Sequence, residues 1–164
     1  MMVPKLNAGA GIIFTASHNP KEWNALKFLN QDGEFISAAD GQEIIQIISS
    51  QSLEFNHIDS LGKYTTYEDA INYHIDQILQ YKHIDVAAVK NAGFHVIVDC
   101  INSTGSISIP PLLDRLGVKY TLLNTENYGD FAHNPEPLPK HLKQLSTAVV
   151  NQKAHLGISI DPDV

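Results

Sequence analysis

The sequence has only one cysteine, Cys100, among its 164 residues, which excludes an intramolecular disulfide and a cysteine-based zinc site. Basic residues are also scarce: 11 Lys and Arg stand against 18 Asp and Glu, for a net charge of −7. Such a balance argues against a nucleic-acid-binding surface, which needs positive charge to neutralise phosphates. No apolar run approaches the ~20 residues of a membrane helix, and the N-terminus makes a poor signal peptide. These absences predict a cytoplasmic protein without nucleic-acid or membrane partners.

The composition is otherwise that of a globular protein, with 43% hydrophobic residues. Short β-branched runs alternate with amphipathic stretches, a pattern typical of α/β folds. The runs predict strands at residues 11–14, 25–29, 96–98, 118–123 and 156–160, and the amphipathic stretches predict helices at 37–50, 67–80, 105–116 and 140–151. A core strand lies near each end of the chain with no element to close over it, so we expect a piece of a longer protein.

The first candidate for chemistry is the polar loop Thr15-Ala16-Ser17-His18-Asn19-Pro20, which follows the first predicted strand. A strand that delivers a serine beside a histidine can expose a nucleophilic hydroxyl with an imidazole nearby to move its proton. The alternative is a plain turn in which Ser17 and Asn19 satisfy backbone groups and Pro20 stiffens the exit. The spacing alone favours the turn.

Two further candidates lie at predicted strand ends. Asp161 and Asp163 flank a proline, and paired carboxylates suit a hard cation such as Mg²⁺, although a solvated acidic turn has the same pattern. The segment from Asp99 to Gly105 joins a strand to a helix and could offer backbone N–H groups to an anion. It lacks the glycine pattern of a nucleotide loop, so helix capping by Ser103 or Thr104 is the favoured interpretation.

Together these motifs resemble the α-D-phosphohexomutases, the family of phosphoglucomutases, phosphomannomutases and phosphoglucosamine mutases. Residues 11–20, GIIFTASHNP, resemble the phosphoserine loop of that family, and 24–27, NALK, match the Asn-Gly-x-Lys that follows it. Residues 96–117 and 131–137 are similar to signatures of the second domain of the family. Residues 157–163, GISIDPD, resemble the metal loop, whose family form is Asp-x-Asp-x-Asp-Arg.

The resemblance implies an α/β fold built from the C-terminal part of a first mutase domain, residues 1–66, a connecting helix, 67–80, and most of a second domain, 81–164. Each domain would be a mixed sheet with flanking helices. The parent protein would interconvert hexose 1-phosphates and hexose 6-phosphates through a phosphoserine and a bisphosphorylated sugar. The fragment itself would lack turnover because the sugar-reading domains are absent.

The resemblance also implies a role for each candidate residue. Ser17 would carry the phosphoryl group, and Mg²⁺ would bind Ser17, Asp161 and Asp163. His18 and Lys27 match positions that orient the phosphoserine or move protons. Ala25 departs from the family by replacing a glycine, and the third metal aspartate with its following arginine is expected directly after the last residue.

Two other classes of function stay open on the sequence. A sugar-phosphate-binding module could keep the serine loop without its chemistry, and a serine hydrolase could be built around Ser17 and His18. The hydrolase is the weaker alternative because the sequence has no G-x-S-x-G elbow.

Overall fold

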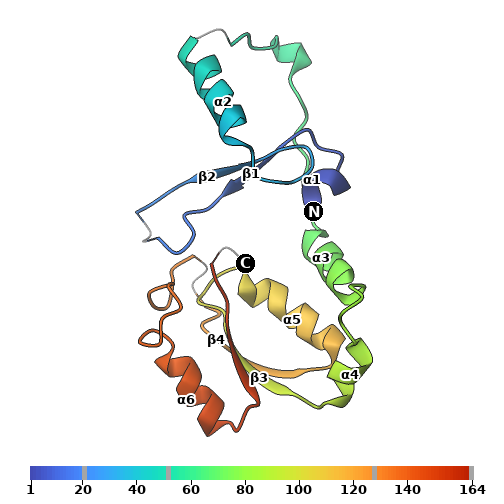
Figure 1. The fold of residues 1–164 in the computed structure, drawn as a ribbon, viewed down its shortest axis with the longest axis vertical. Coiled ribbons are helices and arrows are strands. Elements are labelled where there is room, and N and C mark those ends of the chain that lie inside the picture. The colour runs from blue at the N-terminus through green and yellow to red at the C-terminus, as the bar shows by residue number, and fades with distance from the viewer. Residues whose placement is uncertain (20–21, 51–52, 127–128, 163–164) are drawn as a thin grey trace. The chain divides into compact units, whose positions relative to one another are not determined.

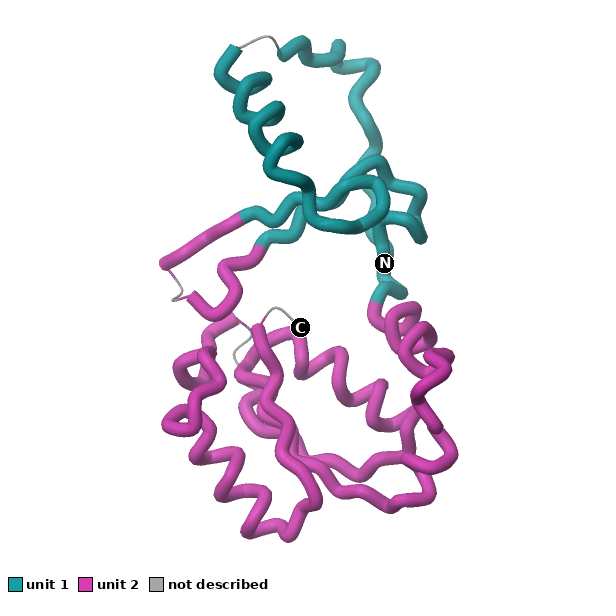
Figure 2. Tube along the Cα trace, viewed as in Figure 1, with its two compact units in different colours: residues 1–14, 26–70 teal, residues 15–25, 71–164 magenta. Residues whose placement is uncertain are grey.

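The computed structural model describes residues 1–19, 22–50, 53–126 and 129–162 and confirms the α/β fold class. The chain divides into two compact units, shown in Figure 2. Unit 1 comprises residues 1–14 and 26–70, and unit 2 comprises residues 15–25 and 71–164. Within the described ranges, no helix is both long and apolar enough to cross a membrane.

Unit 1 is built on an antiparallel hairpin of β1 (Gly11–Phe14) and β2 (Leu26–Leu29), both predicted from their apolar runs. A short helix that the sequence did not indicate, α1 (Met2–Lys5), precedes the hairpin. Gly33 has a φ of +79°, as the Asp-Gly turn after β2 requires.

Helix α2 (Ala38–Ser50) begins as predicted, but its apolar face is not buried. Ser37 and Asp40 cap the helix reciprocally: the Ser37 hydroxyl donates to the Asp40 carboxylate at 2.8 Å and accepts the Asp40 N–H at 3.2 Å. The Ser37 hydroxyl and the Ser37 N–H both donate to Oδ2 of Asp40, at 2.8 Å each, and these two hydrogen bonds lower the pKa of Asp40. Ile47 and Ile48, which share one face of this helix, are both exposed. Ile12, Ile13 and Phe14 of β1 are exposed as well, so these apolar residues of the hairpin and of the helix are not buried within this unit. The 3₁₀ turn η1 (Ile58–Ser60) follows in this unit.

Unit 2 contains a parallel sheet of three strands in the order β4-β3-β5. Its elements are α3 (Ala70–Leu79), α4 (Val86–Asn91), β3 (His95–Asp99), α5 (Gly105–Leu116), β4 (Lys119–Leu123), α6 (Lys143–Asn151) and β5 (Leu156–Ser159). Helix α3 begins three residues later than predicted. Helices α5 and α6 lie on opposite faces of the sheet, as Figure 1 shows. The β3–α5–β4 crossover runs toward one edge of the sheet and the β4–α6–β5 crossover runs back past β3 to the other edge, so two crossovers of the same hand cover opposite faces.

The core of unit 2 is centred on β3. Val96, Ile97 and Val98 are 5%, 0% and 0% exposed, since helices cover both faces of this strand. Val96, Val98 and Cys100 pack with Leu113 of α5 and with Val118. All three strands are parallel, so their carboxyl ends share one edge, where α/β folds bind ligands.

Candidate functional site

The serine loop is the turn that leaves β1, and the structure describes it from Thr15 to Asn19. The backbone N–H and the side-chain Nδ2 of Asn19 both donate to the carbonyl oxygen of Ala16, at 3.1 and 2.8 Å. The N–H of Ser17 donates to Oγ1 of Thr15 at 3.0 Å. Ser17 is thereby held at a φ of +54°, in the left-handed region. A non-glycine residue there is strained, and such strain is concentrated at functional sites.

The hydroxyl of Ser17 turns toward the neighbouring imidazole. Its Oγ lies 3.4 Å from Nδ1 of His18, at the long end of the hydrogen-bond range. The turn interpretation is therefore correct for Asn19, whose side chain does satisfy the backbone, whereas the hydrogen bond of the Ser17 hydroxyl is to a potential base. Ser17 is half-buried and His18 is exposed. A hydroxyl in this position can give its proton to the imidazole when it attacks an electrophile.

Lys27 is the third residue of the predicted catalytic group. It lies half-buried in the middle of β2, opposite Ile13 in the hairpin register. The serine loop belongs to unit 2 and Lys27 to unit 1, so the role of Lys27 stays a prediction.

The predicted metal loop begins where β5 ends. The N–H of Ile160 donates to the carbonyl oxygen of Asp99 at 3.1 Å, and Asp161 follows in an exposed position. Asp163 lies outside the described residues. Mg²⁺ prefers oxygen ligands such as carboxylates and hydroxyls, so the Asp161 carboxylate is a suitable ligand for this ion. Among the described residues, however, no three His, Cys, Asp or Glu side chains gather as a metal site would need.

A buried hydrogen-bond network, which we call the Asp99 cluster (Asp99, Asn124 and His133), holds the carboxyl ends of the strands together. Asp99 is the last residue of β3 and is 1% exposed. Its Oδ1 accepts the N–H of Ile101 at 3.1 Å and Nδ2 of Asn124 at 2.8 Å. Its Oδ2 lies 2.9 Å from Nε2 of His133. A buried carboxylate needs such donors because its water has been removed. The cluster therefore fixes the loops around the strand ends.

The surroundings of His133 favour its protonated form. Its Nε2 faces the Asp99 carboxylate, and its Nδ1 lies 2.9 Å from the carbonyl oxygen of Asn134, so both ring nitrogens meet acceptors. Burial works to lower the pKa of His133, but the hydrogen bonds to Asp99 and Asn134 and the charge of Asp99 outweigh burial and raise it.

We expect this ion pair to make stability depend on pH. The folded state binds the His133 proton more tightly than the unfolded state, whose pKa is about 6.5. The stabilisation is thus fully present below that value and is lost as pH rises through the higher folded pKa. Urea unfolding between about pH 6 and pH 9 should show this fall in the free energy of unfolding, and His133→Gln should lack it. Equal pH slopes in the two chains would exclude His133 as the responsible group.

The segment from Asp99 to Gly105 corrects the capping prediction. Thr104 occupies the N-cap of α5 without a side-chain cap hydrogen bond. Ser103 instead donates its hydroxyl to the carbonyl oxygen of Pro162, at 3.3 Å, and so links this segment to the predicted metal loop. A Cβ on Gly105 would lie 2.8 Å from Cγ2 of Ile160, which shows why glycine begins the helix. Burial, and then the charge of Asp99, raise the pKa of the Cys100 thiol to about 11, so it stays protonated and unreactive.

Comparison with known proteins identifies the family. The family model described as phosphoglucomutase/phosphomannomutase, alpha/beta/alpha domain II, matches residues 72–164. The corresponding model for domain I matches residues 1–55. The chain belongs to the phosphoglucomutase/phosphomannomutase family.

Several curated relatives are named as mutases. A protein named "Probable phosphoglucosamine mutase" from Methanopyrus kandleri is 37% identical over 155 residues, which cover 94% of this chain and 33% of the relative. A "Phosphoglucomutase/phosphomannomutase" from Thermococcus kodakarensis is 34% identical over 96% of this chain and 34% of its own length. The chain thus spans about a third of the length of these relatives.

Solved structures support the fold. The crystal structure of a phosphoglucomutase/phosphomannomutase family protein from Burkholderia thailandensis has a TM-score of 0.76 and 24% identity. The match covers 95% of this chain and 32% of that protein. A putative phosphomannomutase from Thermus thermophilus gives the same TM-score at 22% identity, with 99% and 36% of the two chains covered.

Sequence reasoning missed the Asp99 cluster. It included Asp99 and His133 in family-like segments but gave neither side chain a role. One signal was present in the sequence. Asp99 directly follows the apolar run Val96-Ile97-Val98, and a carboxylate at the end of a buried strand requires hydrogen-bond donors. The partner could not be named, because His133 is 34 residues away.

Proposed function

We propose that this chain is part of a hexose-phosphate mutase in which Ser17 carries the phosphoryl group. The observation behind the proposal is the serine loop, in which a strained, half-buried Ser17 turns its hydroxyl toward His18 within the segment that resembles the phosphoserine loop of the family. The names of the relatives support a sugar phosphate as substrate.

In the proposed reaction the phosphoryl group leaves Oγ of Ser17 and forms a bond to a free hydroxyl of the hexose phosphate. The hydroxyl loses its proton to a base, Oγ of Ser17 takes up a proton as the phosphoryl group leaves it, and the sugar becomes a bisphosphate. Oγ of Ser17 then gives up that proton and accepts the other phosphoryl group of the sugar, the sugar oxygen freed in this step is protonated, and the isomeric hexose phosphate is released. We assign His18 and Lys27 to orienting the phosphoserine and moving protons, since an imidazole and an ammonium can hold phosphate oxygens.

A bound Mg²⁺ would supply charge neutralisation for the phosphoryl group. Asp161 would hold it together with Ser17 and Asp163. The link from Ser103 to Pro162 and the bond from Ile160 to Asp99 support this placement, because they anchor the loop that begins at Asp161.

We expect this chain by itself to bind Mg²⁺ only weakly. Two aspartates leave most of an octahedral shell to water. Calorimetry should detect no tight stoichiometric site in the isolated chain, and in the full-length parent Asp161→Ala should raise the Mg²⁺ concentration needed for turnover. Asp32→Ala, which removes an exposed carboxylate of unit 1, is the matched control. Tight Mg²⁺ binding to the isolated chain would contradict the prediction that its two aspartates form only a weak site.

Mass spectrometry of the full-length parent tests the proposal directly. A mutase purified from its cells should carry one phosphoryl group, and peptide fragmentation should place it on Ser17. A sugar-phosphate-binding module, the alternative function, has no reason to carry this group. The proposal that the parent is a mutase would be overturned if Ser17 were unmodified and no hexose 1-phosphate of a panel were converted.

A further inference from the structure

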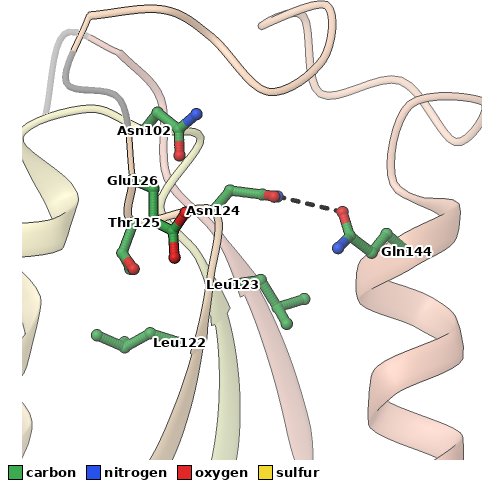
Figure 3. A pocket seen from close by; sticks show the side chains of 7 residues that line it. All are labelled: Asn102, Leu122, Leu123, Asn124, Thr125, Glu126 and Gln144. Atoms are coloured by element: carbon green, nitrogen blue, oxygen red, sulfur yellow. Dashed lines mark hydrogen bonds between the residues drawn. The ribbon is translucent and has the colours of Figure 1, made fainter.

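We propose that a pocket at the carboxyl end of β4 binds a small organic cation through its primary ammonium group. The cavity has a volume of about 410 Å³. Its polar wall, shown in Figure 3, consists of Asn102, Asn124, Thr125, Glu126 and Gln144. All of these residues belong to unit 2, and none has a role in the proposed phosphoryl transfer. The proposal therefore stands or falls separately from the mutase.

The first argument is a buried oxygen without a partner. Asn102 is 7% exposed, and its Nδ2 donates to the carbonyl oxygen of Asp130 at 2.9 Å. This bond fixes the orientation of the amide, because a flipped amide would set two acceptor oxygens against each other. Oδ1 of Asn102 then has no hydrogen-bond partner in the described part of the chain. Native proteins rarely leave a buried acceptor unsatisfied, so this atom points to a ligand that donates.

The second argument is the charge of the wall. Figure 3 shows the Asn102 oxygen and the Glu126 carboxylate directed into the same space. Both groups accept hydrogen bonds, and no lining residue is basic. Nδ2 of Asn124 is already engaged by Asp99 at 2.8 Å and by Oε1 of Gln144 at 3.3 Å. A phosphate or carboxylate would thus meet the negative charge of Glu126 and the Asn102 acceptor, whereas a cation with N–H donors would be attracted by both.

The third argument separates an ammonium group from a metal ion. Hard divalent cations bind best where several carboxylates meet, and the wall offers only one carboxylate, that of Glu126. An ammonium group has three N–H donors, which Asn102, Glu126 and the Thr125 hydroxyl can accept. Leu122 and Leu123 of β4 line the same pocket and offer apolar contact to a carbon chain.

Amide NMR titration of the isotope-labelled chain tests the proposal with three probes at equal ionic strength. The probes are n-butylammonium, n-butanol, which has the same carbon chain without the charge, and K⁺, which has the charge without a donor. We expect saturable shifts at residues 122–126 and at the Asn102 side chain with n-butylammonium only. Glu126→Gln should weaken this binding about tenfold, because it removes a charge-assisted hydrogen bond. Glu68→Gln, an exposed position of unit 1, carries the same charge change and should leave binding unchanged.

Several results would overturn the proposal. Equal shifts with n-butanol would show that charge has no part in binding. Saturation by K⁺ alone would make the pocket a metal-ion site. An unchanged affinity in Glu126→Gln, or no saturable shift with any probe, would mean that the Asn102 oxygen is satisfied by water and that the pocket is not a ligand site.

Discussion

Ser17→Ala in the full-length parent should abolish conversion of hexose 1-phosphate to hexose 6-phosphate. The proposed reaction passes the phosphoryl group through Oγ of Ser17, and no other atom can take over a covalent carrier. Folding should be nearly unaffected, because the backbone bonds of the serine loop come from Thr15, Ala16 and Asn19. Steady-state turnover and the thermal unfolding midpoint, measured on the same preparation, separate the two effects.

Two further variants sharpen this experiment. Ser17→Gly also removes the hydroxyl but relieves the left-handed strain at φ +54°, so it should be as inactive as Ser17→Ala if the hydroxyl is what matters. Ser49→Ala removes an exposed hydroxyl that bonds only its own helix, and it should keep full activity. Near-normal turnover in Ser17→Ala would end the phosphoserine mechanism.

His133→Leu should cost about 3–5 kcal/mol of unfolding free energy, since removing one partner of a buried ion pair leaves the other charge uncompensated. Asp99 would remain 1% exposed with Oδ2 facing a leucine. Urea unfolding of the unsubstituted protein and of His133→Leu at pH 6 measures this loss of unfolding free energy. His74→Leu, at an exposed position on α3, is the matched control and should change stability by less than about 0.5 kcal/mol.

Asp99→Asn distinguishes the charge from the geometry of the Asp99 cluster. The asparagine Oδ1 can still accept from Ile101 and Asn124, and its Nδ2 can donate to a neutral His133. We therefore expect a cost of only about 1–2 kcal/mol. Adding Asp99→Asn to His133→Leu should recover part of the lost stability, because no buried charge then remains. A double variant as unstable as the sum of the singles would show that the two residues are not coupled.

The sequence by itself determined the elements with strong local signals. The β-branched runs gave β1, β3 and β5, and the Ser37 cap gave the start of α2. It also placed Ser17 at the exit of a strand, where the structure shows its contact with His18. These features depend on hydrophobic periodicity, capping and turn chemistry, which act over a few residues.

Only the tertiary structure decided which distant groups meet. Asp99 joins Asn124 and His133, which lie 25 and 34 residues further along the chain, because the parallel strands bring their carboxyl ends to one edge. Ser103, expected to cap α5, instead bonds Pro162, 59 residues away. The exposed face of α2 and the unpartnered oxygen of Asn102 are likewise results of packing. Local patterns specify which residue types are available, but the path of the chain through the sheet sets their partners.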